Sequence, residues 1–166
     1  GNVVPLKRWS KQTPASVAFG YEVQVTALQM AMAYAALAND GILMKPRLVK
    51  EIRSPGGQLL KSIAPEPVRR VVSSETARTM RDFMRQTVER GTGREAAVDW
   101  CVVGGKTGTA RKSDPVTHRY GFKHYSSFIG IAPVDDPRFL CYVVMNEPKG
   151  EIYGGKAAAP IFKAIL

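Results

Sequence analysis

One short motif brings together residues suited to acyl-transfer chemistry, Lys106-Thr107-Gly108-Thr109. The ammonium of Lys106 and a hydroxyl of Thr107 or Thr109 can hold a carboxylate by charge-assisted hydrogen bonds. Gly108 has no side chain, so a substrate can lie against the strand backbone, and a backbone N–H there can point at a developing oxyanion. The motif predicts a substrate-binding strand. The triplet alone is equally compatible with an edge strand that carries a solvated lysine.

The elements that must position this motif belong to an ordinary globular chain. Its 166 residues are 45% hydrophobic, which fits one domain or a large piece of one. The chain contains no run of about 18 apolar residues, so the sequence predicts no membrane span. Its first residues also lack the pattern of a signal peptide. We therefore expect that any membrane anchor lies outside this chain.

The net charge of +10 raises the alternative of a nucleic-acid-binding protein. The densest basic clusters, Lys7-Arg8 and Arg69-Arg70, are short, and no aromatic residues interleave with them. A solvated basic surface, suited to an anionic envelope polymer or membrane face, fits this spread better. We expect no nucleic-acid partner; a nucleic-acid binder would instead show steeply salt-dependent DNA binding.

The cysteines and histidines predict no metal centre and no cofactor. Cys101 and Cys141 match no metal-ligand spacing, and each stands in an apolar run where cysteine usually serves as a small core residue. A disulfide between them is neither required nor excluded by the sequence. His118 and His124 have no partner at ligand spacing, which is typical of loop histidines without function.

The first part of the chain predicts a helix followed by a hairpin. Residues 1–20 are expected to be irregular, and Thr26 with Gln29 forms a candidate capping box. The segment 27–39 is apolar almost all round, which indicates a helix buried on every side and closed by Gly41. Residues 47–53 and 59–63 are a candidate hairpin, and Pro65 and Pro67 indicate a linker.

A second helix is predicted from Glu75 to about Arg90, capped by Ser73 or Ser74. Its expected buried face comprises Ala77, Met80, Phe83, Met84 and Val88. The Lys106 strand is followed by a hairpin of strands 127–132 and 138–145, and a helix begins at Ala157 with Pro160 in its first turn. This order predicts an α+β fold, an antiparallel sheet with packed helices.

Longer blocks around the motif resemble class B penicillin-binding proteins. Residues 18–41 read AFGYEVQVTALQMAMAYAALANDG, residues 104–110 read GGKTGTA and residues 125–133 read YSSFIGIAP. Asp136-Pro137-Arg138, Asn146-Glu147-Pro148-Lys149, Tyr153-Gly154-Gly155 and the Ala-Ala-Pro-Ile-Phe ending also fit, in the family's order. Glu22 departs from the glycine usual there, which suggests that the turn needs no positive φ.

The resemblance implies the penicillin-binding/β-lactamase-like fold and a serine D,D-transpeptidase that cross-links peptidoglycan stem peptides, of the division or sporulation type. Carried onto this chain, Lys106 helps to bind the carboxylate of the substrate or β-lactam and sustains proton transfer. Thr107 and Thr109 hydrogen-bond that carboxylate, with Gly108 between them. The backbone N–H of Thr109 supplies half of the oxyanion hole. Separately from the resemblance, the aromatic residues Tyr120, Phe122 and Tyr125 are candidates for an apolar wall beside the substrate, with a mobile surface loop over 111–125 as the alternative.

The same family also uses Ser-x-x-Lys and Ser-x-Asn, and neither occurs here: no serine has lysine three residues on or asparagine two residues on. We expect both to precede Gly1 in a longer protein, so that residues 1–166 are the C-terminal portion of one transpeptidase domain. Without an activated serine this chain alone is expected to be inactive. An alternative is a β-lactam-binding or sensing module without turnover. The expected partners are stem peptides, β-lactams, the rest of the domain and the division machinery, outside the cytoplasmic membrane.

Overall fold

A computed structural model describes residues 1–114 and 120–166. The chain divides into two compact units, residues 1–30 and 31–166, with the boundary inside helix α2 (Ala27–Ala38). His118 lies outside the described residues, so what the sequence indicates for it stays a prediction. No helix in the described part of the chain is long and apolar enough to cross a membrane.

The N-terminal unit has more regular structure than its prolines and glycines predict. Strands β1 (Asn2–Val3) and β2 (Val23–Gln24) pair antiparallel, and a 3-10 turn η1 (Leu6–Arg8) and helix α1 (Thr13–Ala18) lie between them. The prediction of an irregular segment was therefore wrong in part. Pro14 stands in the first turn of α1, where its missing N–H leaves no helical hydrogen bond unmade.

Glu22 corrects a second expectation in this unit. Its φ is +59°, so the turn does adopt the left-handed conformation that glycine favours. The Thr13 hydroxyl donates to a carboxylate oxygen of Glu22 over 3.1 Å. The glutamate side chain thus contributes a hydrogen bond that the family's glycine does not offer.

The predicted caps of α2 are both present. The Thr26 hydroxyl accepts from the Gln29 N–H over 3.2 Å, and the Gln29 side chain accepts from the Thr26 N–H over 2.9 Å, which confirms the capping box. At the other end, Asp40 and Gly41 have φ of +47° and +83°, and the Gly41 N–H donates back to the Ala36 carbonyl. This Schellman-type turn confirms Gly41 as part of the cap.

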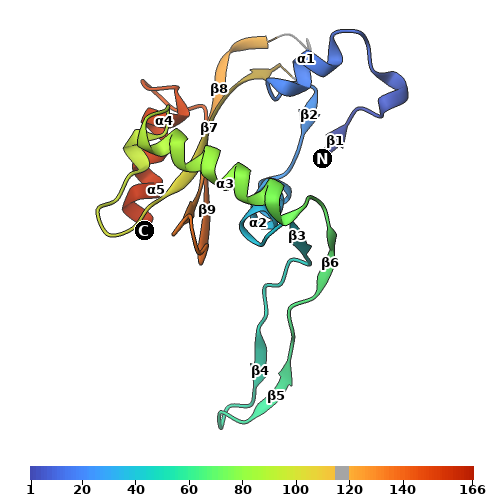
Figure 1. The fold of residues 1–166 in the computed structure, drawn as a ribbon, viewed down its shortest axis with the longest axis vertical. Coiled ribbons are helices and arrows are strands. Elements are labelled where there is room, and N and C mark those ends of the chain that lie inside the picture. The colour runs from blue at the N-terminus through green and yellow to red at the C-terminus, as the bar shows by residue number, and fades with distance from the viewer. Residues whose placement is uncertain (115–119) are drawn as a thin grey trace. The chain divides into compact units, whose positions relative to one another are not determined.

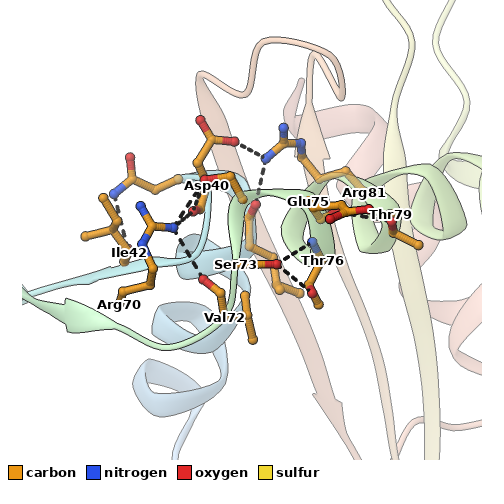
Figure 2. Close-up of polar contacts among 12 residues, drawn as sticks. Asp40, Ile42, Arg70, Val72, Ser73, Glu75, Thr76, Thr79 and Arg81 are labelled. Carbon is orange, nitrogen blue, oxygen red and sulfur yellow. Dashed lines mark hydrogen bonds and ion pairs between the residues drawn. The ribbon is translucent and has the colours of Figure 1, made fainter.

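Two arginines tie this turn to the start of helix α3 (Ser74–Glu89), as Figure 2 shows. Arg81 donates to the Leu37 carbonyl over 2.9 Å and to the Asp40 carboxylate over 3.0 Å. Arg70 donates to the Asp40 carbonyl over 2.6 Å and to the Ser74 hydroxyl over 3.2 Å. One carbonyl in the last turn of α2 and one in the turn that follows it therefore each accept a hydrogen bond from a cation of another element.

Both predicted helical faces need correction. Within residues 31–38 of α2 only Ala36 is fully buried, so the expectation of burial on every side was wrong for this chain. In α3, Ala77, Met84 and Val88 are buried as predicted, but Met80 and Phe83 are 37% and 57% exposed. Arg81 is buried in their place because it has the hydrogen-bond partners described above.

Between the two helices lie two antiparallel strand pairs. Strand β4 (Glu51–Arg53) pairs with β5 (Leu59–Ser62), which confirms the hairpin, although β4 is shorter than predicted. Strand β3 (Ile42–Met44) pairs with β6 (Pro67–Arg70), where the prolines predicted a linker. Pro67 is tolerated because it is the first residue of a strand in a two-stranded sheet. In Figure 1 the hairpin lies apart from α3.

The last third of the chain forms an antiparallel sheet in the order β7-β8-β9. Its strands are β7 (Gly104–Ser113), β8 (Tyr120–Ala132) and β9 (Phe139–Asn146). A 3-10 turn η2 (Arg94–Ala96) precedes it, and helices α4 (Gly154–Ala157) and α5 (Ala159–Ile165) follow it. The predicted hairpin 127–145 is confirmed, and β8 begins earlier than expected.

Helices cover both faces of this sheet, which fixes the direction of each β7 side chain. On one face Met84, Ile131 and Val134 form a core with Tyr34 and Ala38 of α2 packed against it. On the other, Phe128 meets Phe162 of α5 edge to face, with ring centroids 5.0 Å apart. Because side chains alternate along a strand, neighbouring residues of β7 face different helical layers.

Cys101 and Cys141 both pack against the Phe128 core, as their apolar contexts predict, and both are free thiols, which the sequence leaves open. Burial raises the pKa of each thiol above its ordinary value. No group of three or more potential metal ligands occurs among the residues described.

Candidate active site

Lys106 lies on β7, an edge strand of the sheet formed by the described residues, as the sequence predicts. Its side chain is exposed, and its ammonium donates to the carbonyl of Thr107 over 2.7 Å. Gly104 lies two residues earlier on the same face, and a Cβ there would touch Met84 and Val134. Lys106 therefore projects from the sheet face that α3 covers in part, and its charge stays accessible.

Gly108 shares this face, and its lack of a side chain has a visible local reason. An added Cβ would lie 2.5 Å from the hydroxyl oxygen of Ser127, the residue paired with it on β8. The glycine leaves room for Ser127, and no side chain projects from the strand at this position beside Lys106. Substrate approach along this strand remains a prediction, and Ser127 is a neighbour that the motif did not indicate.

The hydroxyls of Thr107 and Thr109 belong to the opposite face and have protein partners. Thr107 Oγ1 lies 2.8 Å from Thr92 Oγ1, and Thr109 Oγ1 accepts from the backbone N–H of Gly154 over 3.1 Å. The Thr109 hydroxyl thereby caps the N-terminus of α4, whose N-cap Tyr153 supplies no side-chain bond. The carboxylate-binding role given to both threonines stays a prediction, and each hydroxyl has a structural role as well.

Glycines 154 and 155 explain how α4 approaches the motif so closely. A Cβ on Gly154 would lie 2.4 Å from the Gly108 carbonyl oxygen and 2.2 Å from that of Ser127. A Cβ on Gly155 would lie 2.1 Å from the Thr92 carbonyl oxygen. The Gly-Gly pair therefore supports the motif strand from behind, with Thr92 beside it. The sequence predicts only that a helix ends near Arg90, and it does not indicate a role for Thr92 in the loop that follows.

The three aromatics predicted as a substrate wall differ in their surroundings. Phe122 is fully exposed, and Tyr120 and Tyr125 are 58% and 43% exposed. Tyr125 has a cation above its ring, since Lys112 Nζ lies 4.8 Å from the ring centroid. A register irregularity separates Tyr120 and Phe122 from the regular part of β8. A wall shared by the three aromatic residues therefore stays a prediction. Tyr125 contributes to it a ring that is in contact with Lys112.

An ion-pair cluster joins Lys112 to the end of β9. Lys112 donates to the Glu147 carboxylate and, over 2.8 Å, to Asn146 Oδ1, while Lys123 lies 3.0 Å from the other Glu147 oxygen. Hydrogen bonds from Lys112 and Lys123 lower the pKa of Glu147 below its ordinary value. The bond to Glu147 in turn raises the pKa of Lys112.

Comparison with known proteins agrees with this geometry. A family model described as the penicillin binding protein transpeptidase domain matches residues 1–166. The chain belongs to this transpeptidase family. Penicillin-binding protein PbpB of Mycolicibacterium smegmatis is 38% identical over 99% of the chain, and stage V sporulation protein D of Bacillus subtilis is 40% identical over 100%. The chain spans about a quarter of these relatives, 27% and 26% respectively.

A solved structure of this family shows the same fold. Penicillin binding protein 3 of Mycobacterium tuberculosis, complexed with aztreonam, superimposes with a TM-score of 0.86 at 36% identity. The match covers 98% of this chain and 38% of that one. The α+β fold of the penicillin-binding transpeptidase domain and the class B resemblance are therefore both confirmed.

Proposed function

We propose that the complete protein containing this chain is a peptidoglycan D,D-transpeptidase, in which residues 1–166 supply the Lys-Thr-Gly strand. The observation that carries the proposal is the exposed Lys106 on a free strand edge, with Gly108 beside it. The family match over residues 1–166 supports it. The structure of a relative complexed with aztreonam supports β-lactams as ligands.

The proposed reaction proceeds through a serine acyl-enzyme. A serine from the rest of the domain attacks the D-Ala-D-Ala carbonyl, and the carbonyl oxygen becomes an oxyanion that the Thr109 N–H stabilises. The peptide C–N bond breaks, and the amine of D-Ala leaves after taking up a proton. The amine of a second stem then attacks the ester, releases the serine and completes the cross-link.

In this reaction Lys106 binds the terminal carboxylate and sustains proton transfer, with the hydroxyls of Thr107 and Thr109 as additional donors. Each hydroxyl already contacts Thr92 or Gly154 on the opposite sheet face, so binding the ligand requires that this internal bond be exchanged for one to the carboxylate. Tyr125 forms the apolar side of the site. We therefore expect the protein to act at the outer face of the cytoplasmic membrane, with stem peptides and cell-wall machinery as partners.

The test is to label the complete protein with a fluorescent penicillin and to map the modified residue by peptide mass spectrometry. We expect a single serine within Ser-x-x-Lys, outside residues 1–166, and no adduct on the isolated chain. An adduct on a serine of this chain would contradict the assignment. Transpeptidation assays on synthetic stem peptides then distinguish the enzyme from a β-lactam-binding module of the same fold. Such a module is acylated by the β-lactam but forms no cross-link.

A further inference from the structure

The part of the β7–β8 pair that projects beyond β9 contains a second set of interacting side chains. Strand β9 pairs with β8 only as far as Asn146, opposite Tyr125. Strands β7 and β8 continue their pairing past this point, through Arg111–His124 and Ser113–Tyr120. We call residues 111–113 and 120–124 the β7–β8 extension. Among the described strands, none other than β7 and β8 pairs with this extension.

Glu147 follows directly after β9 and contacts both strands of this extension. Its backbone N–H donates to the His124 carbonyl over 2.9 Å, which adds one more bond after the last strand pair. Its carboxylate receives Lys112 from β7 and Lys123 from β8. One side chain therefore bridges the end of the sheet to the two strands that project beyond it.

The backbone of Glu147 is held in an unfavourable conformation to make this bridge. Its φ is +55°, and a non-glycine residue in that region is strained by roughly 1–2 kcal/mol. Glutamate also lacks the local hydrogen bonding that lets asparagine and aspartate adopt this region more readily. Strain of this kind persists where the surrounding contacts outweigh it, and it is concentrated at functional sites.

The bridge lies close to the candidate site. Tyr125 lies beneath Lys112 and shares the sheet face of Ser127, two residues along β8, and of Gly108 and Lys106 on β7. Lys112 follows Thr109 by three residues, about 10 Å along a strand. A carboxylate that fixes Lys112 thereby fixes both Tyr125 and the end of the motif strand.

We propose that Glu147 is a positioning residue, which holds the β7–β8 extension and Tyr125 in place beside the Lys-Thr-Gly strand through Lys112 and Lys123. This role rests on the proposed function, because the ligand it prepares for is the stem peptide or β-lactam. Glu147 itself takes no part in bond making. It affects the affinity of the pre-covalent complex, which forms before acylation begins.

The test uses the complete protein and the variant Glu147→Gln, which keeps the shape of the side chain and removes its charge. We expect the apparent dissociation constant of the pre-covalent penicillin complex to rise about three- to tenfold, with the limiting acylation rate within about twofold of wild type. Amide hydrogen exchange of residues 120–125 should become faster. Glu147→Asp, which keeps the charge, should restore part of the affinity.

Glu66→Gln is the matched control, because Glu66 forms an exposed ion pair with Lys45 away from the site. This variant should leave both the apparent dissociation constant for penicillin and the exchange of residues 120–125 unchanged. The double variant Glu147→Gln with Lys112→Met should lose less affinity than the sum of the two single variants, since both remove the Lys112–Glu147 contact. If amide hydrogen exchange at residues 120–125 is the same in Glu147→Gln as in wild type, the proposal is overturned. It is also overturned if Glu147→Gln lowers only the limiting acylation rate and leaves the dissociation constant unchanged. A wild-type protein inert to penicillin would overturn the proposed function, while the exchange still decides whether Glu147 holds the extension.

Discussion

The hydroxyl oxygens of Thr92 and Thr107 lie 2.8 Å apart, which joins the loop after α3 to the middle of the Lys-Thr-Gly strand. We predict that Thr92→Val destabilises the protein by about 1 kcal/mol, because one hydrogen-bond partner is lost. It should also weaken penicillin binding, because the Thr107 hydroxyl loses the contact that orients it. Thermal unfolding and acylation kinetics of the complete protein measure both effects.

Thr79→Val is the control for this experiment. The Thr79 hydroxyl donates to the Glu75 carbonyl within α3, an ordinary bond inside a helix. We expect acylation by this variant to match wild type. Equal acylation by Thr92→Val would show that Thr92 does not orient Thr107 for ligand binding.

The turn between α2 and β3 depends on Gly41 for two separable reasons. Its φ is +83°, and an added Cβ would lie 2.2 Å from the Val72 carbonyl oxygen. Gly57 has the same φ of +83° but nothing within 4 Å of an added Cβ. We predict that Gly57→Ala costs about 1 kcal/mol and Gly41→Ala clearly more, measured by denaturant unfolding. Equal losses would show that the Val72 contact relaxes without cost.

The Glu147 cluster predicts a pH dependence of stability with a definite sign. The pKa of Glu147 is lowered from 4.5, so its contribution is present above that value and is lost as the pH falls through the folded-state pKa. The pKa of Lys112 is raised from 10.5, so its contribution is present below that value and is lost as the pH rises through the folded-state pKa. In the described part of the chain, Lys112 and Lys123 face Glu147, and Tyr125 adjoins Lys112.

The measurement is the thermal midpoint of wild type and Glu147→Gln between about pH 3 and pH 7. The wild type should be the more stable at pH 7, and the difference should shrink towards pH 3. A difference that is constant over this range would mean that the carboxylate charge contributes nothing, and that the substitution acts through packing alone.

How much of this architecture the sequence predicts depends on how local the signal is. The capping box at Thr26 and Gln29 and the helix start at Ser73 were predictable because both partners lie within one turn. The alternating apolar runs likewise predict the hairpin of β8 and β9. Pairing of β3 with β6 was missed because Pro67 suggests a linker, and its compatibility with the first position of an outer strand depends on a partner more than 20 residues away.

The candidate site divides in the same way. Lys106, Gly108 and the edge strand were predictable from one motif and its context. Thr92 and Glu147 were not assigned roles, because the contact of Thr92 with Thr107 and that of Glu147 with Lys112 cross 15 and 35 residues. The positive φ of Glu22 contradicted the expectation from its residue type because Thr13 offers its carboxylate a partner.

Strand β9 predicts the behaviour of residues 1–166 as a separate molecule. Among the described strands it pairs only with β8, and Phe139 and Val144 on it are 62% and 42% exposed. A strand with one unpaired edge and exposed apolar side chains is an association site. We predict concentration-dependent association in analytical ultracentrifugation, relieved when the rest of the domain is present. A monomer at all concentrations, with a sharp thermal transition, would contradict this prediction.

The central claim is that Lys106 receives the ligand carboxylate, and the second-order acylation rate constant of the complete protein tests it most directly. Fluorescent penicillin should acylate Lys106→Ala at least about a hundredfold more slowly than wild type, because a charge-assisted bond and proton transfer are both lost. The thermal midpoint should change little, since the Lys106 side chain is exposed. Lys61→Ala, an exposed lysine on β5, should react like wild type. Acylation of Lys106→Ala at the wild-type rate would remove Lys106 from the site and contradict the account.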